Sequence, residues 1–168
     1  MNEMKRILVT GGSGFIGSHT CLALLEKNYE IWVIDSLLNS SSLSLNRVKK
    51  LTKNGENLFF FKGDLRDLKF IRDVFQKAKD SGRPIAAVIH FAGLKSVAES
   101  IREPIKYWEV NVNGTLNLLH IMEEYKCKTI VFSSSATIYG VSNNLPIKES
   151  FQIESINPYG TTKIVIEK

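Results

Sequence analysis

Tyr159 and Lys163 are two residues near the end of the chain whose types and spacing could do chemistry. They stand four positions apart in the segment NPYGTTKIVIEK, residues 157–168. In an α-helix this spacing places both side chains on one face, one above the other. A lysine ammonium beside a phenol favours the phenolate, so the pair could accept a proton. Such a pair is common by chance, so whether it indicates a functional site depends on the elements that position it.

The most specific stretch near the start is VTGGSGFIGSH, residues 9–19. Gly12, Gly14 and Gly17 satisfy the pattern G-x-G-x-x-G, with Gly11 before them. The glycines follow a predicted strand at 5–10 and open a predicted helix, which is the context that gives the pattern its meaning. Glycines allow a tight turn and a close backbone approach, and the helix N-terminus attracts phosphate. The loop therefore predicts a dinucleotide-binding site.

Asp35 closes the second predicted strand, residues 30–35. It follows the glycines by about twenty residues, where a carboxylate can accept hydrogen bonds from an adenosine ribose. The same carboxylate would repel a 2′-phosphate, which favours NAD over NADP. The alternative is a surface aspartate that caps the next segment.

Strands and helices alternate along the chain. We expect strands at 5–10, 30–35, 58–64, 86–93 and 129–135, each buried on both faces, and a loop at 35–46 that enters a helix. A longer helix is expected over 104–125, with apolar residues on one side: Ile105, Trp108, Val112, Leu116 and Leu119. A second apolar stripe comprises Ile71, Val74, Phe75 and Ala78. The pattern predicts an α/β fold of the Rossmann type, a doubly wound parallel sheet.

Other polar residues follow the predicted strands, and strand carboxyl ends face the ligand crevice in such sheets. Asp64 and Leu65 stand at the end of the third strand, where adenine would sit. His90 ends the fourth strand, and we favour a structural role for it over a catalytic one. Lys95 could reach a phosphate or ribose. Ser133–Ser135 stand at the carboxyl end of the fifth strand and could bond a sugar hydroxyl, or form a polar turn.

Composition fits one globular domain: 168 residues, 43% hydrophobic and 23% charged. The net charge of +5 comes from scattered basic residues, so we expect no nucleic-acid partner. The apolar runs have strand length, and we expect no membrane association. Cys21 and Cys127 match no metal or redox spacing, which predicts reduced thiols in a cytoplasmic protein without a metal site.

Together these motifs resemble the extended short-chain dehydrogenase/reductase family. They are T-G-G-x-G-x-x-G, a strand-two aspartate, a serine after strand five and Y-x-x-x-K. HFAGLKSVAES, NVNGT and SSSATIYG are similar to the UDP-glucose 4-epimerase family within it, and the resemblance covers essentially all 168 residues. Sugar-nucleotide dehydratases of the family usually carry an Asp-Glu pair after the strand-five serine or threonine. Here Ala136 and Thr137 follow Ser135.

The resemblance implies a catalytic set and a cofactor set. Ser135 matches the catalytic serine, Tyr159 the base, and Lys163 its electrostatic partner and ribose ligand; Lys95, Ser135 and Tyr159 would also meet the substrate. At the pyrophosphate, the implied NAD contacts are Gly11, Gly12, Gly14, Phe15, Ile16 and Gly17. At the adenosine ribose they are Asp35, Ser36, Leu37, Leu38, Asn39 and Ser40, with Asp64 and Leu65 at adenine and Phe91, Ala92, Gly93, Leu94 and Lys95 along the cofactor's middle. Asn111 is a further implied contact, although some relatives have the contacting asparagine one position earlier, where this chain has Val110.

The implied reaction interconverts UDP-glucose and UDP-galactose, as part of galactose metabolism. Tyr159 takes the proton of the sugar 4-hydroxyl, NAD accepts and returns hydride at C4, and the 4-keto sugar turns over in between. In the family the Y-x-x-x-K helix continues into a substrate-binding region. We therefore expect residues 1–168 to be an incomplete NAD-binding domain without the carboxyl-terminal substrate domain, inactive alone and homodimeric in the complete protein.

Two alternatives stay open from the sequence. The complete protein could act on another nucleotide sugar as an epimerase or oxidoreductase, because the region that sets specificity lies outside these residues. The chain could also be a non-catalytic NAD-binding fragment. Such a module would bind NAD without turnover, and a Tyr159→Phe change would then alter nothing measurable.

Overall fold

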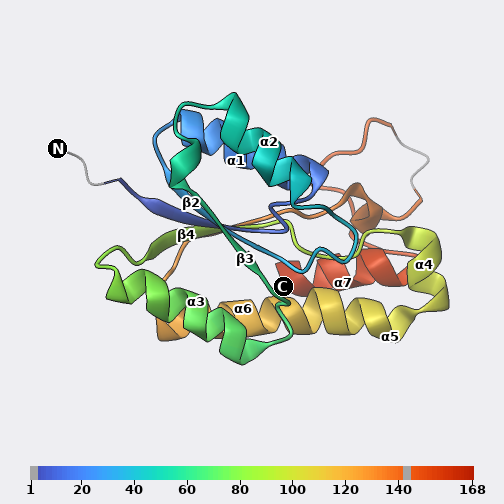
Figure 1. The fold of residues 1–168 in the computed structure, drawn as a ribbon. Coiled ribbons are helices and arrows are strands. Elements are labelled where there is room, and N and C mark those ends of the chain that lie inside the picture. Colours follow the sequence, from blue (N-terminus) through green and yellow to red (C-terminus); the bar gives the residue numbers. More distant parts are fainter. Residues whose placement is uncertain (1–3, 142–144) are drawn as a thin grey trace. The chain divides into compact units, whose positions relative to one another are not determined.

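The computed structural model describes residues 4–141 and 145–168. Over these residues the chain forms a parallel sheet of five strands in the order β3-β2-β1-β4-β5 (Figure 1). The strands are β1 Arg6–Thr10, β2 Glu30–Asp35, β3 Leu58–Lys62, β4 Ile85–His90 and β5 Ile130–Phe132. The predicted doubly wound α/β fold is confirmed. The strand order reverses between β1 and β4, and sheets of this kind bind ligands at the carboxyl ends beside that point.

The helices fall between the strands as predicted, and one more follows the last strand. They are α1 Phe15–Glu26, α2 Leu43–Leu51, α3 Leu68–Asp80, α4 Val97–Arg102, α5 Pro104–Tyr107, α6 Gly114–Glu124 and α7 Pro158–Glu167. Short turns of 3-10 helix span Gly55–Asn57 and Ala136–Tyr139. The chain divides into two compact units. The first combines the chain up to Ala92 with Asn117–Ser133, and the second combines Gly93–Leu116 with the chain from Ser134 onward.

In the first unit, helices cover both faces of the sheet (Figure 1). On one face, Val9 and Val33 pack with Cys21 and Leu25 of α1 and Val48 of α2. On the other, α3 and the C-terminal part of α6 pack against the opposite side chains of β1 and β2. The apolar stripe predicted for α3 is confirmed, because its four residues are all buried: Ile71, Val74, Phe75 and Ala78. Asp67 starts this helix by accepting a hydrogen bond from the Phe70 N–H.

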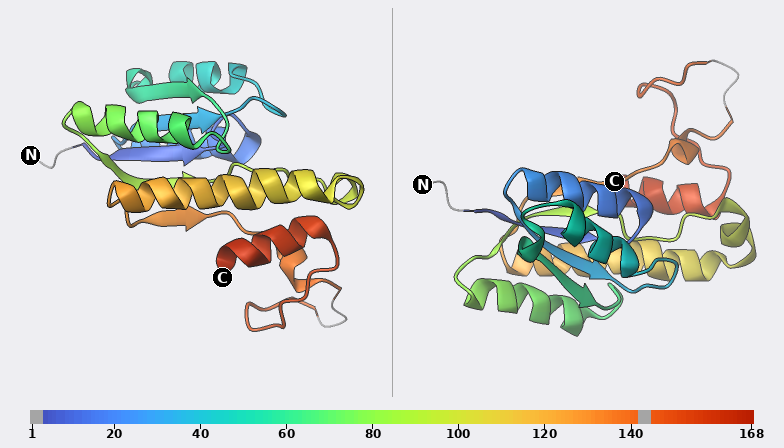
Figure 2. Two further views of the ribbon diagram at one scale, coloured as in Figure 1. Left: turned by 90° about the horizontal axis from the view of Figure 1, so that it is seen from below. Right: turned by 45° about the horizontal axis from the view of Figure 1, so that its top comes forward.

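The expectation that every strand is buried on both faces is wrong for β3 and β5. These two strands form opposite edges of the sheet (Figure 2). Phe59 of β3 is 44% exposed and Val131 of β5 is 58% exposed. By contrast, every residue of β1 and β2 is buried. An apolar run alone does not distinguish a central strand from an edge strand.

The long helix predicted over 104–125 contains an interruption. A π-helical turn, Trp108–Asn113, separates α5 from α6. A π turn inserts an extra residue, so it rotates the side chains on either side of it relative to one another. Apolar residues of the predicted stripe, Ile105, Trp108, Leu116 and Leu119, are exposed, whereas Tyr107 and Asn111 are buried.

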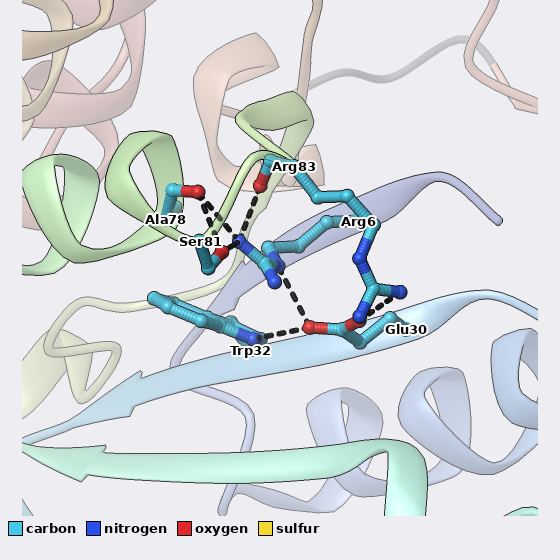
Figure 3. Close-up of polar contacts among 6 residues, drawn as sticks. All are labelled: Arg6, Glu30, Trp32, Ala78, Ser81 and Arg83. Carbon is cyan, nitrogen blue, oxygen red and sulfur yellow. Dashed lines mark hydrogen bonds and ion pairs between the residues drawn. The ribbon is translucent and has the colours of Figure 1, made fainter. Parts of the chain in front are cut away.

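A buried ion-pair network lies where β1 and β2 begin (Figure 3). Arg6 Nε donates to Glu30 Oε1 at 2.7 Å, and Trp32 Nε1 donates to the same oxygen at 2.8 Å. Arg83 Nη1 pairs with Glu30 Oε2 at 2.7 Å. Arg6 Nη1 also donates to the Ala78 carbonyl and the Ser81 hydroxyl. The network thereby links two strands to the connection between α3 and β4.

Both cysteines of the first unit, Cys21 and Cys127, are free and buried. Burial raises the pKa of the Cys21 thiol to about 12, so this thiol stays protonated at neutral pH. Within residues 4–141 and 145–168, no helix is long and apolar enough to cross a membrane.

Candidate active site

The glycine turn of the first unit is as tight as its sequence predicts. Gly11 has a φ of +69° and donates its N–H to the Ile34 carbonyl at 2.8 Å. A Cβ atom on Gly11 would lie 2.6 Å from the Ala92 nitrogen, and one on Gly17 would lie 2.3 Å from the Gly11 oxygen. Any other residue at these positions would push the turn away from β4 or α1 away from the turn.

Helix α1 begins directly after this turn, with Gly14 as its N-cap. Its first turn carries no acidic side chain. The side chains of Phe15 and Ile16 point outward and are 79% and 57% exposed. The backbone N–H groups of a helix's first turn lack intrahelical partners and carry the positive end of its dipole. The turn thus has the features of an anion-binding site.

Asp35 ties the glycine turn to the loop after β2. Its Oδ2 accepts from the Ser13 N–H at 3.0 Å. Its Oδ1 accepts from the Leu37 N–H at 2.9 Å and from the Ser40 hydroxyl at 2.8 Å. The carboxylate is buried, whereas three neighbours predicted to surround the ribose are exposed: Ser36, Leu38 and Asn39. Asp35 therefore orders the predicted ribose loop as well as ending the strand.

Asp64 and Leu65 follow β3, and the Gly63 N–H donates to the Asp35 carbonyl at 3.1 Å. The Asp64 carboxylate pairs with Arg66 at 2.7 Å. Hydrogen bonds from Arg66 hold the pKa of Asp64 below its ordinary value. The Leu65 side chain is buried in the core. Gly63 thus joins the start of this segment to the end of β2, and the place of Asp64 and Leu65 near adenine stays a prediction.

His90 is 1% exposed, and its Nδ1 lies 2.5 Å from the Thr10 hydroxyl. The Ala92 N–H donates to the same hydroxyl at 3.4 Å, and the His90 ring stacks on Phe132. These contacts support the structural role favoured for His90. Sequence reasoning missed Thr10, whose place directly before the first glycine was the available signal.

In the second unit, Asn111 holds the segment that follows Gly93. Its Oδ1 accepts from the Leu94 N–H at 2.8 Å, and its Nδ2 donates to the Leu94 carbonyl at 2.9 Å. Gly93 has a φ of +155°, and a Cβ there would lie 3.0 Å from Asn111 Oδ1. Lys95, one residue further, is exposed. The Asn111 side chain, a predicted cofactor contact, thus pairs with backbone in this structure.

Helix α7 presents Tyr159 and Lys163 together, as their spacing predicts. Asn157 caps the helix by accepting from the Gly160 N–H at 2.8 Å, and Pro158 occupies its first turn. Both side chains are buried, and Lys163 Nζ lies 5.9 Å from the centre of the Tyr159 ring. Burial lowers the pKa of Lys163 to about 8, against the opposing effect of Glu167.

A second buried tyrosine, Tyr107, packs edge-on against Tyr159 with ring centres 6.4 Å apart. Its hydroxyl accepts from the Ser96 N–H and donates to Glu99, both at 3.0 Å. Burial and the Glu99 carboxylate raise the pKa of Tyr107. Tyr107 is therefore held protonated and is a packing partner of Tyr159, which sequence reasoning did not single out.

Ser135 starts the 3-10 turn Ala136–Tyr139 as its N-cap. Its hydroxyl oxygen accepts from the Thr137 N–H at 3.3 Å and from the Thr137 hydroxyl at 3.0 Å. The turn lies against α7 (Figure 2), and a Cβ on Gly160 would lie 2.9 Å from the Thr137 carbonyl oxygen. The glycine after Tyr159 thus lets the serine turn approach the first turn of α7.

Comparison with known proteins identifies the family. The family model described as GDP-mannose 4,6 dehydratase matches residues 8–168. The chain belongs to this family. Its extended short-chain dehydrogenase/reductase fold agrees with the resemblance drawn from the motifs.

Its relatives include two proteins named as 4-epimerases. The chain is 52% identical over 162 residues to UDP-glucose 4-epimerase of Bacillus subtilis (strain 168), covering 96% of this chain and 46% of the relative. It is 50% identical over 165 residues to UDP-glucose 4-epimerase 2 of Arabidopsis thaliana, covering 98% of this chain and 46% of the relative.

This chain is also similar to a solved structure of a protein with the same name. The crystal structure of UDP-glucose 4-epimerase from Bifidobacterium longum, in complex with NAD+ and UDP, superposes with a TM-score of 0.89 at 43% identity. The match covers 97% of this chain and 47% of that protein. The chain thus spans about half the length of the relatives that it matches.

The residues after Ser135 bear on which chemistry of the GDP-mannose 4,6 dehydratase family this chain carries. The acid pair expected of a dehydratase would fall at Ala136 and Thr137. Ala136 is exposed, and the Thr137 hydroxyl donates to Ser135. Neither side chain can serve as a general acid or base near neutral pH. The two positions after Ser135 therefore lack the acidic pair that the family's name, a dehydratase, would lead one to expect.

Proposed function

We propose that the complete protein is a UDP-glucose 4-epimerase that interconverts UDP-glucose and UDP-galactose in galactose metabolism. The observation that carries the proposal is the buried Tyr159–Lys163 pair on α7, next to the Ser135 turn. The names of the B. subtilis and A. thaliana relatives agree with it. We place the protein in the cytoplasm, in accord with its free thiols.

The cofactor of this proposal is NAD, which supplies the acceptor and donor of hydride at the sugar C4. The first unit fits it chemically: a glycine turn too tight for any Cβ at Gly11 or Gly17, a helix N-terminus free of acidic side chains, and an ordered aspartate. The backbone at Phe15 and Ile16 would bind the pyrophosphate. Asp35 would accept from a ribose hydroxyl and repel a 2′-phosphate, which selects NAD.

Tyr159 would take the proton of the sugar 4-hydroxyl and later return it. A base for this step has to hold the proton reversibly near neutral pH. Lys163, with a pKa lowered to about 8, still carries its charge at pH 7 and would favour the phenolate. Ser135 would hydrogen-bond the same sugar hydroxyl and orient it. The hydroxyl of Tyr107 would stay out of this exchange, because it donates to Glu99.

The complete gene product tests the proposal through its turnover of UDP-galactose to UDP-glucose. Tyr159→Phe should lower kcat by about 10² to 10⁴, the range expected for loss of a positioned base. The matched control is Tyr125→Phe, whose hydroxyl bonds Gln76 in the first unit and which should leave kcat unchanged.

Three results would change the proposal. Wild-type protein that binds NAD without converting any nucleotide sugar would make the chain part of a binding module. Turnover of a different nucleotide sugar would keep the chemistry and replace the substrate. Full activity of the Tyr159→Phe variant would remove the base from the mechanism.

The proposal includes a homodimer. In the second unit Ile101, Ile105, Trp108 and Leu116 are large apolar side chains that are 39% to 73% exposed. They belong to α4, α5, the π turn and α6. We infer that these exposed apolar side chains belong to an interaction surface, and a second copy of the chain is the partner that the family resemblance implies.

A further inference from the structure

We propose that Thr162 is a positioning residue, whose hydroxyl fixes the first turn of α7, and with it Tyr159, to the Leu94 segment. The inference rests on the proposed function for its catalytic consequence. Thr162 lies between Tyr159 and Lys163 on the same helix and is fully buried, with 0% of its surface exposed. Neither the proposed reaction nor the predicted cofactor contacts use this side chain.

The Thr162 hydroxyl makes two hydrogen bonds inside the second unit. It donates to the Tyr159 carbonyl at 2.6 Å and accepts from Asn111 Nδ2 at 3.2 Å. A threonine hydroxyl has a single hydrogen to donate. That hydrogen is committed to the backbone of the residue that carries the proposed base. The Asn111 bond in turn fixes the direction in which the hydroxyl points.

Asn111 carries the connection onward to the segment after β4. Its oxygen accepts from the Leu94 N–H, and its nitrogen donates to both the Leu94 carbonyl and Thr162. Both amide hydrogens are thereby used. The Thr115 hydroxyl holds the Asn111 carbonyl at 2.5 Å. A continuous chain of hydrogen bonds therefore runs from the Leu94 backbone through two buried side chains to the Tyr159 backbone.

The first turn of α7 is held at a second point by its cap. Asn157 accepts from the Gly160 N–H at 2.8 Å, and the Thr161 N–H donates to the Asn157 carbonyl at 3.0 Å. Thr162 holds the same turn from within the fold. A misplacement of about 1 Å can cost about 10²-fold in rate when a reacting group must be aligned. Losing one of the two attachments should therefore act on turnover more than on substrate binding.

Valine and serine substitutions separate the hydroxyl from the shape of the side chain. Thr162→Val keeps the branched shape, removes both hydrogen bonds and leaves a buried Asn111 donor without its partner. Thr162→Ser keeps the hydroxyl. In the complete gene product we expect kcat to fall about 10- to 100-fold in the valine variant, with KM within about 3-fold of wild type. The serine variant should retain kcat within about 3-fold.

Amide hydrogen exchange of the same variants gives a readout that does not need turnover. Peptides covering residues 93–96 and 157–162 should exchange faster in Thr162→Val, and Thr162→Ser should match wild type. Unchanged exchange in the valine variant would overturn the inference, as would equal losses of kcat in both variants. If wild-type protein shows no epimerisation, the proposed function fails, and the exchange result alone decides whether Thr162 holds this turn.

Discussion

At the scale of single residues, Lys163 combines a functional need with a cost to stability. Its ammonium is buried at 5% exposure, and this burial lowers its pKa from 10.5 to about 8. The unfolded chain then binds more protons than the folded protein between about pH 8 and pH 10.5. The free energy of unfolding therefore rises with pH through this window, and the cost is fully present below pH 8.

Replacing Lys163 by methionine should consequently abolish turnover and stabilise the protein without cofactor. At pH 7 we expect a gain of about 1–3 kcal/mol, because one pKa unit corresponds to about 1.4 kcal/mol. The gain should shrink towards pH 10. Thermal unfolding at both pH values measures it, with Lys95→Met as the exposed control that should change little. A methionine variant that unfolds more easily than wild type at pH 7 would contradict this account.

At the scale of elements, sequence periodicity predicts which residues share a turn or a helix face better than it predicts whether their side chains are buried. The glycine turn follows from spacings of two and three residues. The α3 stripe and the Tyr159–Lys163 face follow from spacings of three and four residues, which fix geometry locally. The edge exposure of Phe59 does not follow, because it depends on which strand lies beside β3. The π turn at Trp108–Asn113 does not follow from periodicity either, because its buried Asn111 bonds Leu94, which lies 17 positions earlier in the chain.

The Arg6–Glu30 pair is another link between elements that periodicity does not predict, since 24 positions separate the two residues. Both side chains are at most 4% exposed. Glu30→Gln should destabilise the protein by about 3–5 kcal/mol, because the charge of Arg6 would stay buried without its partner. Urea unfolding measures this. The control is Asp73→Asn, which breaks the exposed pair with Lys69 and should cost less than about 1 kcal/mol. Equal costs in both variants would show that burial of the pair has no energetic consequence.

At the scale of the whole molecule, the sequence pattern predicts the class of fold and the order of its elements. Charge and apolar content do not predict whether the protein binds a second copy of itself, because scattered positive residues and single exposed apolar side chains are ordinary features of a surface. The structure adds the information that Ile101, Ile105, Trp108 and Leu116 are exposed in one unit. A self-complementary contact uses the same patch on both copies, so a charge placed there enters the interface twice.

Ile105, at 73% exposure, is therefore the position at which a single change should separate the proposed dimer. Ile105→Glu would bury two like charges at the symmetric contact, each at a cost of several kcal/mol without a partner. We expect the dimer dissociation constant of the complete gene product to rise at least about 100-fold, measured by sedimentation velocity. Leu51→Glu is the matched control, because Leu51 is 69% exposed on α2 in the first unit. Should Ile105→Glu remain dimeric while Leu51→Glu dissociates, the interface would lie on the first unit and the exposed side chains of the second would have another partner.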